Sequence, residues 1–143
     1  MTQTLEGAVT EVAEVIAAIS GMGAAPATPQ ENINERIFAL TYLMTSATDI
    51  GPTGTMMHLV SIASDILTPH TNLAQNIAAL LPILDLAVTA CMTEITTIAR
   101  FFDQSIDTFA TLRVEFLPFY PYSGTDCVGY RVLLENVKLM VDL

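Results

Sequence analysis

The sequence predicts an α/β fold of the α+β type, in which a four-stranded mixed or antiparallel sheet is flanked by two helices. Two segments place apolar residues at helical spacing, and four others carry the apolar runs or alternation typical of strands. Clusters of proline, glycine and small polar residues separate these segments. The 143 residues are the length of one domain. We therefore expect a single domain over residues 1–143, in the order helix-strand-strand-helix-strand-strand.

The first helix is predicted over residues 5–20. Its apolar residues recur every three or four positions: Leu5, Val9, Val12, Ile16 and Ile19. This spacing places Glu11 and Glu14 elsewhere on the helical wheel. Gly21 and Gly23 end the helix, and the two prolines of the following segment predict an extended connection.

A hairpin is predicted next, from strands at about 36–46 and 55–67. The first strand carries apolar residues on both faces, which is typical of a central strand. Residues 47–54 contain two glycines and a proline, so we expect them to form the turn.

The main helix follows this hairpin, with Asn72 as its N-cap and Gln75 as a capping-box partner. Its apolar residues form one continuous stripe, so the helix should pack on the sheet: Leu73, Ile77, Leu80, Leu81, Leu84, Val88, Cys91 and Ile95. Pro82 is expected to kink it, because its ring displaces a backbone hydrogen bond.

Two strands close the chain. The first is predicted over 105–117, with its inward residues at alternate positions: Ala110, Leu112, Val114 and Phe116. Pro118 is expected to end it. Residues 119–126 are predicted to form a turn-rich aromatic loop that leads into the final strand.

The final strand changes phase along its length. Apolar residues occupy even positions from Val128 to Leu134 and odd positions from Val137 to Leu143. Because strand side chains alternate between faces, this change requires a bulge or a second covering surface. We expect a bulge near Glu135. The first half should pack on the subunit's own helix, and the second half should meet the other face or an adjacent subunit.

Six apolar residues are candidate contacts to a partner or a second copy: Ile50, Met56, Met57, Val137, Leu139 and Val141. The last three belong to the second half of the final strand. The first three would form an exposed hairpin tip, and exposed apolar patches are scarce on monomers. Packing within the subunit is the alternative for the two methionines, since methionine commonly fills gaps in cores.

The chain is unusually apolar. Hydrophobic residues make up 52% and charged residues 14%, with a mean hydropathy of +0.51. Two interpretations stay open, a rich core and an apolar surface covered by partner subunits. The best candidate for a membrane span, Ile77 to Met92, contains Pro82 and Asp85, and no basic residue precedes Arg36. We therefore expect neither a membrane span nor a secretory signal.

The charge balance is strongly acidic. Fifteen acidic residues against five basic ones give a net charge of −10 and a pI of about 4.2. Nucleic-acid binding requires lysine and arginine to displace counterions from phosphates. The composition therefore excludes a sequence-reading DNA binder, but it suits a protein past which DNA slides without adhering.

No catalytic, metal or cofactor site is predicted. His58, Ser61 and Asp65 suggest a hydrolase triad, but on a strand His58 points to one face and the other two to the opposite face. Asp103 and Asp107 would lie roughly 13 Å apart on an extended segment, beyond the ~5 to 9.5 Å of glycosidase pairs. The two histidines match no ligand spacing, and no glycine-rich phosphate loop occurs. We expect a protein that is not an enzyme, with His58 as a satisfied sheet residue and His70 in a loop.

The two cysteines have no redox-motif spacing. Cys91 lies on the apolar stripe of the main helix and is expected to be a small core residue. Cys127 is expected in a turn before the last strand. The sequence does not decide between a disulfide that joins them and two free thiols, and a reducing cytoplasm favours free thiols.

Three segments, taken in order, resemble the small tail-terminator and neck proteins of long-tailed bacteriophages. They are Val-Thr-Glu-Val-Ala-Glu-Val-Ile-Ala-Ala-Ile at 9–19, Met-His-Leu-Val-Ser-Ile at 57–62 leading into Asn-Ile-Ala-Ala-Leu-Leu-Pro-Ile-Leu-Asp at 76–85, and Gly-Thr-Asp-Cys-Val-Gly-Tyr-Arg-Val at 124–132. Such proteins carry an N-terminal helix, a hairpin, a helix with a Leu-Pro-apolar-apolar-acidic motif and a closing strand with glycine and an aromatic residue.

The resemblance implies a non-enzymatic subunit of the virion tail and neck, assembled in the host cytoplasm. Its copies would form a ring, usually a homo-hexamer, that contacts the tail tube protein and the head-tail connector protein. DNA would pass through the lumen without specific binding, and no membrane or cofactor would be involved. A head-completion or connector protein of the same neck is the alternative. A small ligand-binding or enzymatic α+β domain is the alternative of another class, and it would need a pocket with convergent polar groups.

Overall fold

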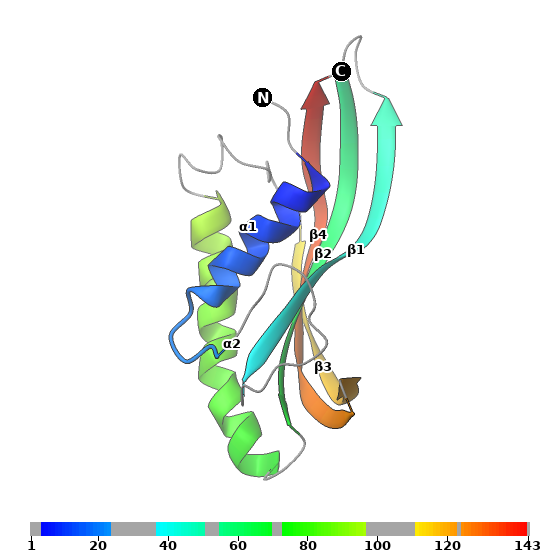
Figure 1. Cartoon of the computed structure of the whole chain (residues 1–143). Coiled ribbons are helices and arrows are strands. Elements are labelled where there is room, and N and C mark those ends of the chain that lie inside the picture. The colour runs from blue at the N-terminus through cyan, green and yellow to red at the C-terminus, as the bar shows by residue number, and fades with distance from the viewer. Residues whose placement is uncertain are drawn as a thin grey trace.

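The computed structural model describes residues 4–23, 37–50, 55–69, 73–96, 111–122 and 124–142. Its elements are α1 (Leu5–Ala17), β1 (Phe38–Ile50), β2 (Thr55–Pro69), α2 (Leu73–Thr96), β3 (Thr111–Tyr122) and β4 (Thr125–Asp142) (Figure 1). Their types and order confirm the predicted α+β fold. The sheet is antiparallel in the order β1-β2-β4-β3, and both helices cover the same face of it (Figure 1).

The main core lies between the two helices and the sheet. Helix α1 contacts β1 and β2, and helix α2 contacts β2 and β4. The largest fully buried side chains of this core come from both layers: Val12, Ile16, Val60, Ile62, Ile66, Leu80, Leu134 and Leu139. Thr4 caps α1, because its hydroxyl accepts a hydrogen bond from the backbone N–H of Gly7 at 3.0 Å. Glu11, which the helical spacing places away from the apolar stripe, is also buried.

Helix α2 buries a stripe that overlaps the predicted one in part: Leu80 and Cys91 are buried as predicted, and Leu84 packs against the core. Its buried residues are Asn76, Leu80, Ile83, Ala87 and Cys91. Leu81, which was expected to face the sheet, is exposed, and so are Leu86 and Met92. Apolar residues surround much of this helix, so their spacing alone could not select the buried side. The helix continues through Pro82, and the predicted N-cap Asn72 lies outside the described residues.

The predicted bulge is present in β4. Two residues of β4, Glu135 and Asn136, lie opposite the single residue Ser61 of β2. Asn136 has a φ of 61°, a left-handed conformation that asparagine tolerates better than most residues. The extra residue compensates the phase change in the sequence, so that Leu134 and Val137 lie on the same face of the sheet.

This geometry corrects the prediction for the end of β4. Val137 and Leu139 are both 0% exposed and belong to the main core, against which Leu5 and Val9 of α1 also pack. They are therefore not available as contacts to another subunit. The change of phase does not mark a change of covering surface, because the bulge absorbs it.

A second bulge lies at the same level on the other side of β2. Thr45 of β1 pairs with Ser61, and Met44 is the extra residue before it. Bulges bend and twist strands, and the sheet changes direction at this level (Figure 1). Beyond it three strands continue together and form what we call the projecting arm, which comprises residues 45–50, 55–60 and 137–142. Among the described residues, the pairing of β3 with β4 begins at Thr111 and Glu135.

Strand β3 runs through the proline that was expected to end it. Its pairing with β4 shifts register between Leu117 and Tyr120, which leaves Pro118 and Phe119 without directly paired residues. Proline has no N–H group and is tolerated where a ladder is interrupted. Much of the predicted loop is therefore strand, and Cys127 pairs with Tyr120 instead of lying in a turn.

The sheet curls until residues of its two edge strands meet. The rings of Phe38 on β1 and Tyr122 on β3 have centroids 5.4 Å apart, although two strands lie between β1 and β3. This contact belongs to a second apolar cluster on the face away from the helices: Phe38, Leu40, Leu67 and Cys127, with Leu117, Tyr120 and Tyr122 packed against them. The curled end of the sheet thus encloses part of its helix-free face.

Candidate functional site

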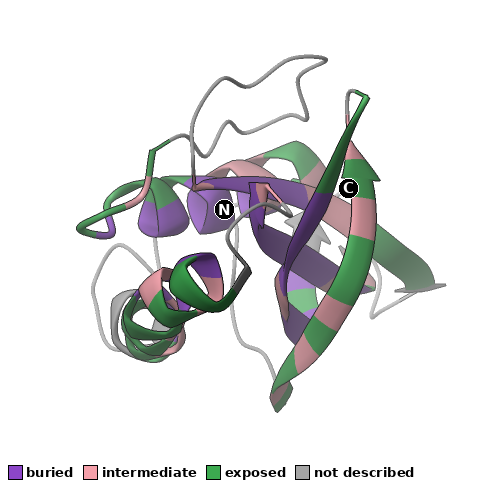
Figure 2. Ribbon diagram, turned by 90° about the horizontal axis from the view of Figure 1, so that it is seen from below, coloured by how far each residue is buried: buried purple, intermediate pink, exposed green. Residues whose placement is uncertain are grey.

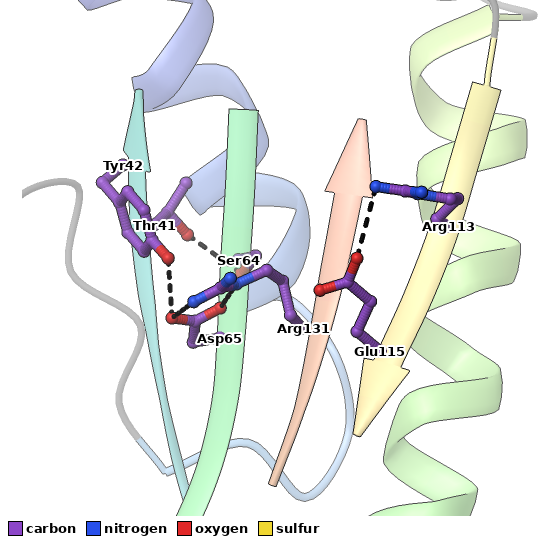
Figure 3. Close-up of polar contacts among 7 residues, drawn as sticks. All are labelled: Thr41, Tyr42, Ser64, Asp65, Arg113, Glu115 and Arg131. Atoms are coloured by element: carbon purple, nitrogen blue, oxygen red, sulfur yellow. Dashed lines mark hydrogen bonds and ion pairs between the residues drawn. The ribbon is translucent and has the colours of Figure 1, made fainter. Parts of the chain in front are cut away.

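A buried carboxylate forms the centre of a polar cluster on the helix-free face. Asp65 of β2 is 0% exposed and pairs directly with Arg131 of β4. Its carboxylate accepts hydrogen bonds from Nε of Arg131 at 2.8 Å and from Nη2 at 3.3 Å (Figure 3). The hydroxyl of Tyr42 on β1 donates a further hydrogen bond to it at 2.9 Å. One carboxylate therefore connects three neighbouring strands.

A second polar contact lies at the adjacent position, on the opposite face. The hydroxyl oxygens of Thr41 and Ser64 are 3.1 Å apart and buried under the helices (Figure 3). The two residues are directly paired across β1 and β2. A register slip by one residue would separate these hydroxyls and would also move Asp65 away from its donors. The polar contacts therefore help to fix the register of the central strands.

The charge of Asp65 and burial set the pKa values of the surrounding groups. Desolvation, followed by the hydrogen bond to Asp65, raises the pKa of Tyr42. Desolvation, followed by the negative charge of Asp65, raises the pKa of Tyr120 to about 12. The hydrogen bond to Asp65 raises the pKa of Arg131. Both tyrosines are therefore neutral donors at neutral pH around a single ion pair.

This arrangement suits holding strands together more than it suits catalysis. A nucleophile or general base needs a free lone pair directed at a substrate. Both oxygens of Asp65 already accept hydrogen bonds, and solvent does not reach the side chain. Nearer the surface, Arg113 makes an ion pair with Glu115 at 3.3 Å (Figure 3). It makes a second ion pair with Glu135 at 2.8 Å. The first pair lies within β3, and the second connects β3 to β4.

The residues considered as a hydrolase triad are not brought together. His58 lies in the projecting arm, where its Nδ1 is 2.7 Å from the hydroxyl of Thr48, the residue paired with it on β1. Strand alternation directs His58 to the face opposite Ser61 and Asp65. The prediction of a satisfied sheet histidine is thus confirmed. Several other positions named above lie outside the described residues: His70, Asp103, Asp107 and residues 105–110.

The described residues contain no group of three or more His, Cys, Asp or Glu side chains placed to hold a metal ion. Cys91 is buried in the main core, as predicted, and Cys127 is buried in the second cluster on the other face. Both are free thiols. Desolvation raises the pKa of Cys91 to about 12 and also raises that of Cys127, so neither forms a reactive thiolate at neutral pH.

The six candidate contact residues have different environments. Val137 and Leu139 lie in the core, as described above. Met56 and Met57 are half-buried at successive positions of β2 in the projecting arm, so they face opposite sides of it. Ile50 of β1 and Val141 of β4 are both paired directly with Met56 of β2. The side chains of Ile50 and Val141 are not among those that the structure describes.

The sequence reasoning missed an exposed apolar surface on helix α2. By length and composition alone, its residues 74–92 are apolar enough to cross a membrane, and 28% of this window is buried. The large apolar side chains that this helix and β3 expose are Leu81, Leu86, Met92, Val114, Phe116 and Phe119. The prediction that Val114 and Phe116 face inward is therefore wrong. Much of the outer side of α2 is accessible (Figure 2). The signal in the sequence was the presence of apolar residues on both flanks of the predicted stripe.

Comparisons with known proteins assign no family to this chain. It matches no protein-family model and no curated protein.

Proposed function

We propose that this protein is a tail terminator of a long-tailed bacteriophage. Its copies would form a ring, of six subunits, that caps the tail tube and joins it to the head connector. The proposal starts from the resemblance of residues 9–19, 57–62, 76–85 and 124–132 to such proteins. The structural observation that carries it furthest is the exposed apolar surface of α2, in a chain with a net charge of −10.

The charge of the chain argues for a protein partner on this surface. Helix α2 contains no lysine or arginine, and the whole chain has only five. Anionic lipid surfaces attract basic residues and repel acidic proteins. An apolar surface on such a chain is therefore better suited to another protein surface, and subunits of a ring provide one at every position.

The same charge suits a passage for DNA. Six copies at −10 each would carry −60. Any share of this charge that faces the lumen would repel phosphates and allow DNA to pass without adhering. The role needs no chemistry, which agrees with a buried carboxylate whose two oxygens are both occupied by hydrogen-bond donors.

Disruption of the gene in the genome that encodes the chain tests this proposal. A terminator stops tube polymerisation, so its loss should give tails of uncontrolled length that lack heads. Tails of normal length without heads would instead assign the chain to head completion, which is the alternative in the same neck. Infectious particles of normal shape would contradict both roles. Electron cryomicroscopy of intact particles gives an independent readout, because the ring should lie between tube and connector.

A further inference from the structure

The end of β3 is a short piece that is separated from the rest of the strand. Beyond the register shift between Leu117 and Tyr120, only three described residues of β3 pair with β4, and one of them is Pro121. Pro121 has no N–H group to donate to the ladder. We call residues 118–122 the flap. It lies at the end of the sheet opposite the projecting arm (Figure 1), and the break in pairing lies at its start.

A ring contact closes the flap against the other edge of the sheet. Tyr122 packs on Phe38 of β1, with 5.4 Å between the ring centroids. Tyr120 and Tyr122 also pack against the second apolar cluster, in which Cys127 is 1% exposed. A pair of rings adds a modest attraction to the burial of its apolar area. Because β1 and β3 are not neighbours in the sheet, side-chain contacts and not strand pairing hold the flap to β1.

The closed flap also buries a polar group without satisfying it. The hydroxyl oxygen of Tyr122 is shielded from solvent and has no hydrogen-bond partner among the described residues. A buried hydroxyl of this kind has lost its hydrogen bonds to water and has gained none in the protein. Opening of the flap would hydrate it. The side chain of Tyr122 therefore favours the closed flap through its ring and disfavours it through its hydroxyl.

The apolar cluster under the flap is much smaller than the main core. Among the described residues, four buried side chains form the second apolar cluster and seventeen form the main core. Local opening requires less free energy where fewer apolar contacts are lost. We propose that the flap opens away from β1 while the main core stays folded, and that its opening exposes the second apolar cluster. This inference is independent of the proposed function, and it gives the helix-free face of the sheet a covered and an uncovered form.

The two native cysteines report on this opening in the full chain. Cys127 belongs to the second apolar cluster and Cys91 to the main core, and both are buried free thiols. Arg100 and Arg113 lie between them in the sequence, so trypsin places them on different peptides for mass spectrometry. With excess iodoacetamide under native conditions, Cys127 should react about tenfold faster than Cys91 or more.

Urea separates flap opening from global unfolding. Below the unfolding transition, urea should accelerate the reaction of Cys91 strongly and that of Cys127 weakly, because global unfolding exposes much more surface than flap opening does. Equal rates for the two thiols, with equal dependence on urea, overturn the proposal.

Two substitutions of Tyr122 should change the reaction rate of Cys127 in opposite directions. Tyr122→Phe keeps the ring and removes the unsatisfied hydroxyl, so the rate should fall by about fivefold or more. Tyr122→Ala removes the ring contact with Phe38, so the rate should rise by about fivefold or more. A thiol that reagent reaches without movement of the flap would not be protected by Tyr122→Phe. A Cys127 rate that this variant leaves unchanged or raises therefore overturns the proposal.

Phe116→Ala is the matched control, because it removes an aromatic ring of β3 on the other side of the break in pairing. Phe116 is 50% exposed and contacts Tyr130, which packs against the main core. The Cys127 rate should stay the same in this variant, and an acceleration as large as that of Tyr122→Ala overturns the flap. The Cys91 rate checks folding in every variant. If Tyr122→Ala accelerates Cys91 as well, that variant unfolds globally and Tyr122→Phe decides.

Discussion

The carboxylate of Asp65 and the guanidinium group of Arg131 meet at 2.8 Å from directly paired positions of β2 and β4. The pair lies inside the curled end of the sheet, with Tyr42 donating from β1. A charge in such a place is tolerated because its partners are fixed by strand pairing. Removal of one partner should therefore affect the whole sheet.

We expect Asp65→Asn to lower the free energy of unfolding by about 3–5 kcal/mol, because Arg131 would lose its charged partner in a largely buried site. Urea denaturation followed by circular dichroism measures the change. Glu115→Gln is the control, since it weakens an exposed ion pair and should cost less than about 1 kcal/mol. Equal stability of the Asp65→Asn and Glu115→Gln variants would contradict the structural role assigned to Asp65.

Stability should fall at alkaline pH. The pKa of Tyr120 is raised from 10.0 to about 12, so the folded protein keeps this proton where the unfolded chain has lost it. The contribution of the neutral tyrosine is complete below pH 10 and is lost as the pH rises from 10 to about 12. Urea midpoints across this range measure the decline. Tyr120→Phe should make the decline shallower, and an unchanged slope would argue against the raised pKa.

Gly129→Ala should destabilise the sheet strongly. A methyl group at Gly129 would collide with the backbone carbonyl of Ile66 on the neighbouring strand, and a paired strand cannot move aside as a flexible side chain can. We expect a loss of about 1–3 kcal/mol or more, measured by thermal or urea unfolding. Gly124→Asn is the contrasting variant, because Gly124 has a φ of +78° with open space around it and asparagine tolerates that conformation. A neutral Gly129→Ala would show that the strands are further apart.

The bulge in β4 should depend on residue 136. Asn136→Val should cost about 1–2 kcal/mol, because a β-branched residue is strained at a φ of 61°. Asn136→Gly should be neutral or stabilising. Deletion of Asn136 is predicted to be far more damaging, since it would turn Val137 and Leu139 out of the core. Soluble expression with native stability after this deletion would contradict the bulge.

Leu139→Asp should prevent folding, because it places an unpaired carboxylate in the main core. Leu86→Asp is the matched surface variant and should yield a folded protein, since Leu86 is 47% exposed on α2. Circular dichroism and solubility distinguish the two. A folded Leu139→Asp protein that fails only to associate would return Leu139 to the list of subunit contacts.

The elements could be predicted from the sequence because each depends on a local pattern. The helical spacing of α1 and the phase change of β4 can each be read from a few consecutive residues. The phase change also predicted the bulge that the structure has at Glu135 and Asn136. The face of the sheet on which Val137 lies could not be predicted in the same way. A bulge and a second covering surface explain the same phase change, and only the pairing with β2 decides between them.

The polar cluster depends on contacts between distant parts of the chain. Asp65 and Arg131 are 66 residues apart in sequence, and their meeting requires the register of β2 on β4. The buried side of α2 was unpredictable for another reason, since Leu81 and Ile83 are equally apolar and lie on different sides of the helix. The prediction that Pro118 ends β3 was wrong, because a proline disrupts a regular hydrogen-bond ladder but is tolerated where the ladder is interrupted.

The two bulges opposite Ser61 set the direction of the projecting arm, whereas other features of the sequence determine the packing of the core. Hydrophobic alternation fixes which side chains enter the core, while one extra residue on each side of β2, Met44 and Asn136, sets the direction in which the arm leaves it. Substitutions at these two positions would change the direction of the arm beyond its base, which is held in the main core by Val60, Val137 and Leu139. In related chains that contact different partners, the direction of the arm could thus change through these two backbone positions without substitutions of core residues.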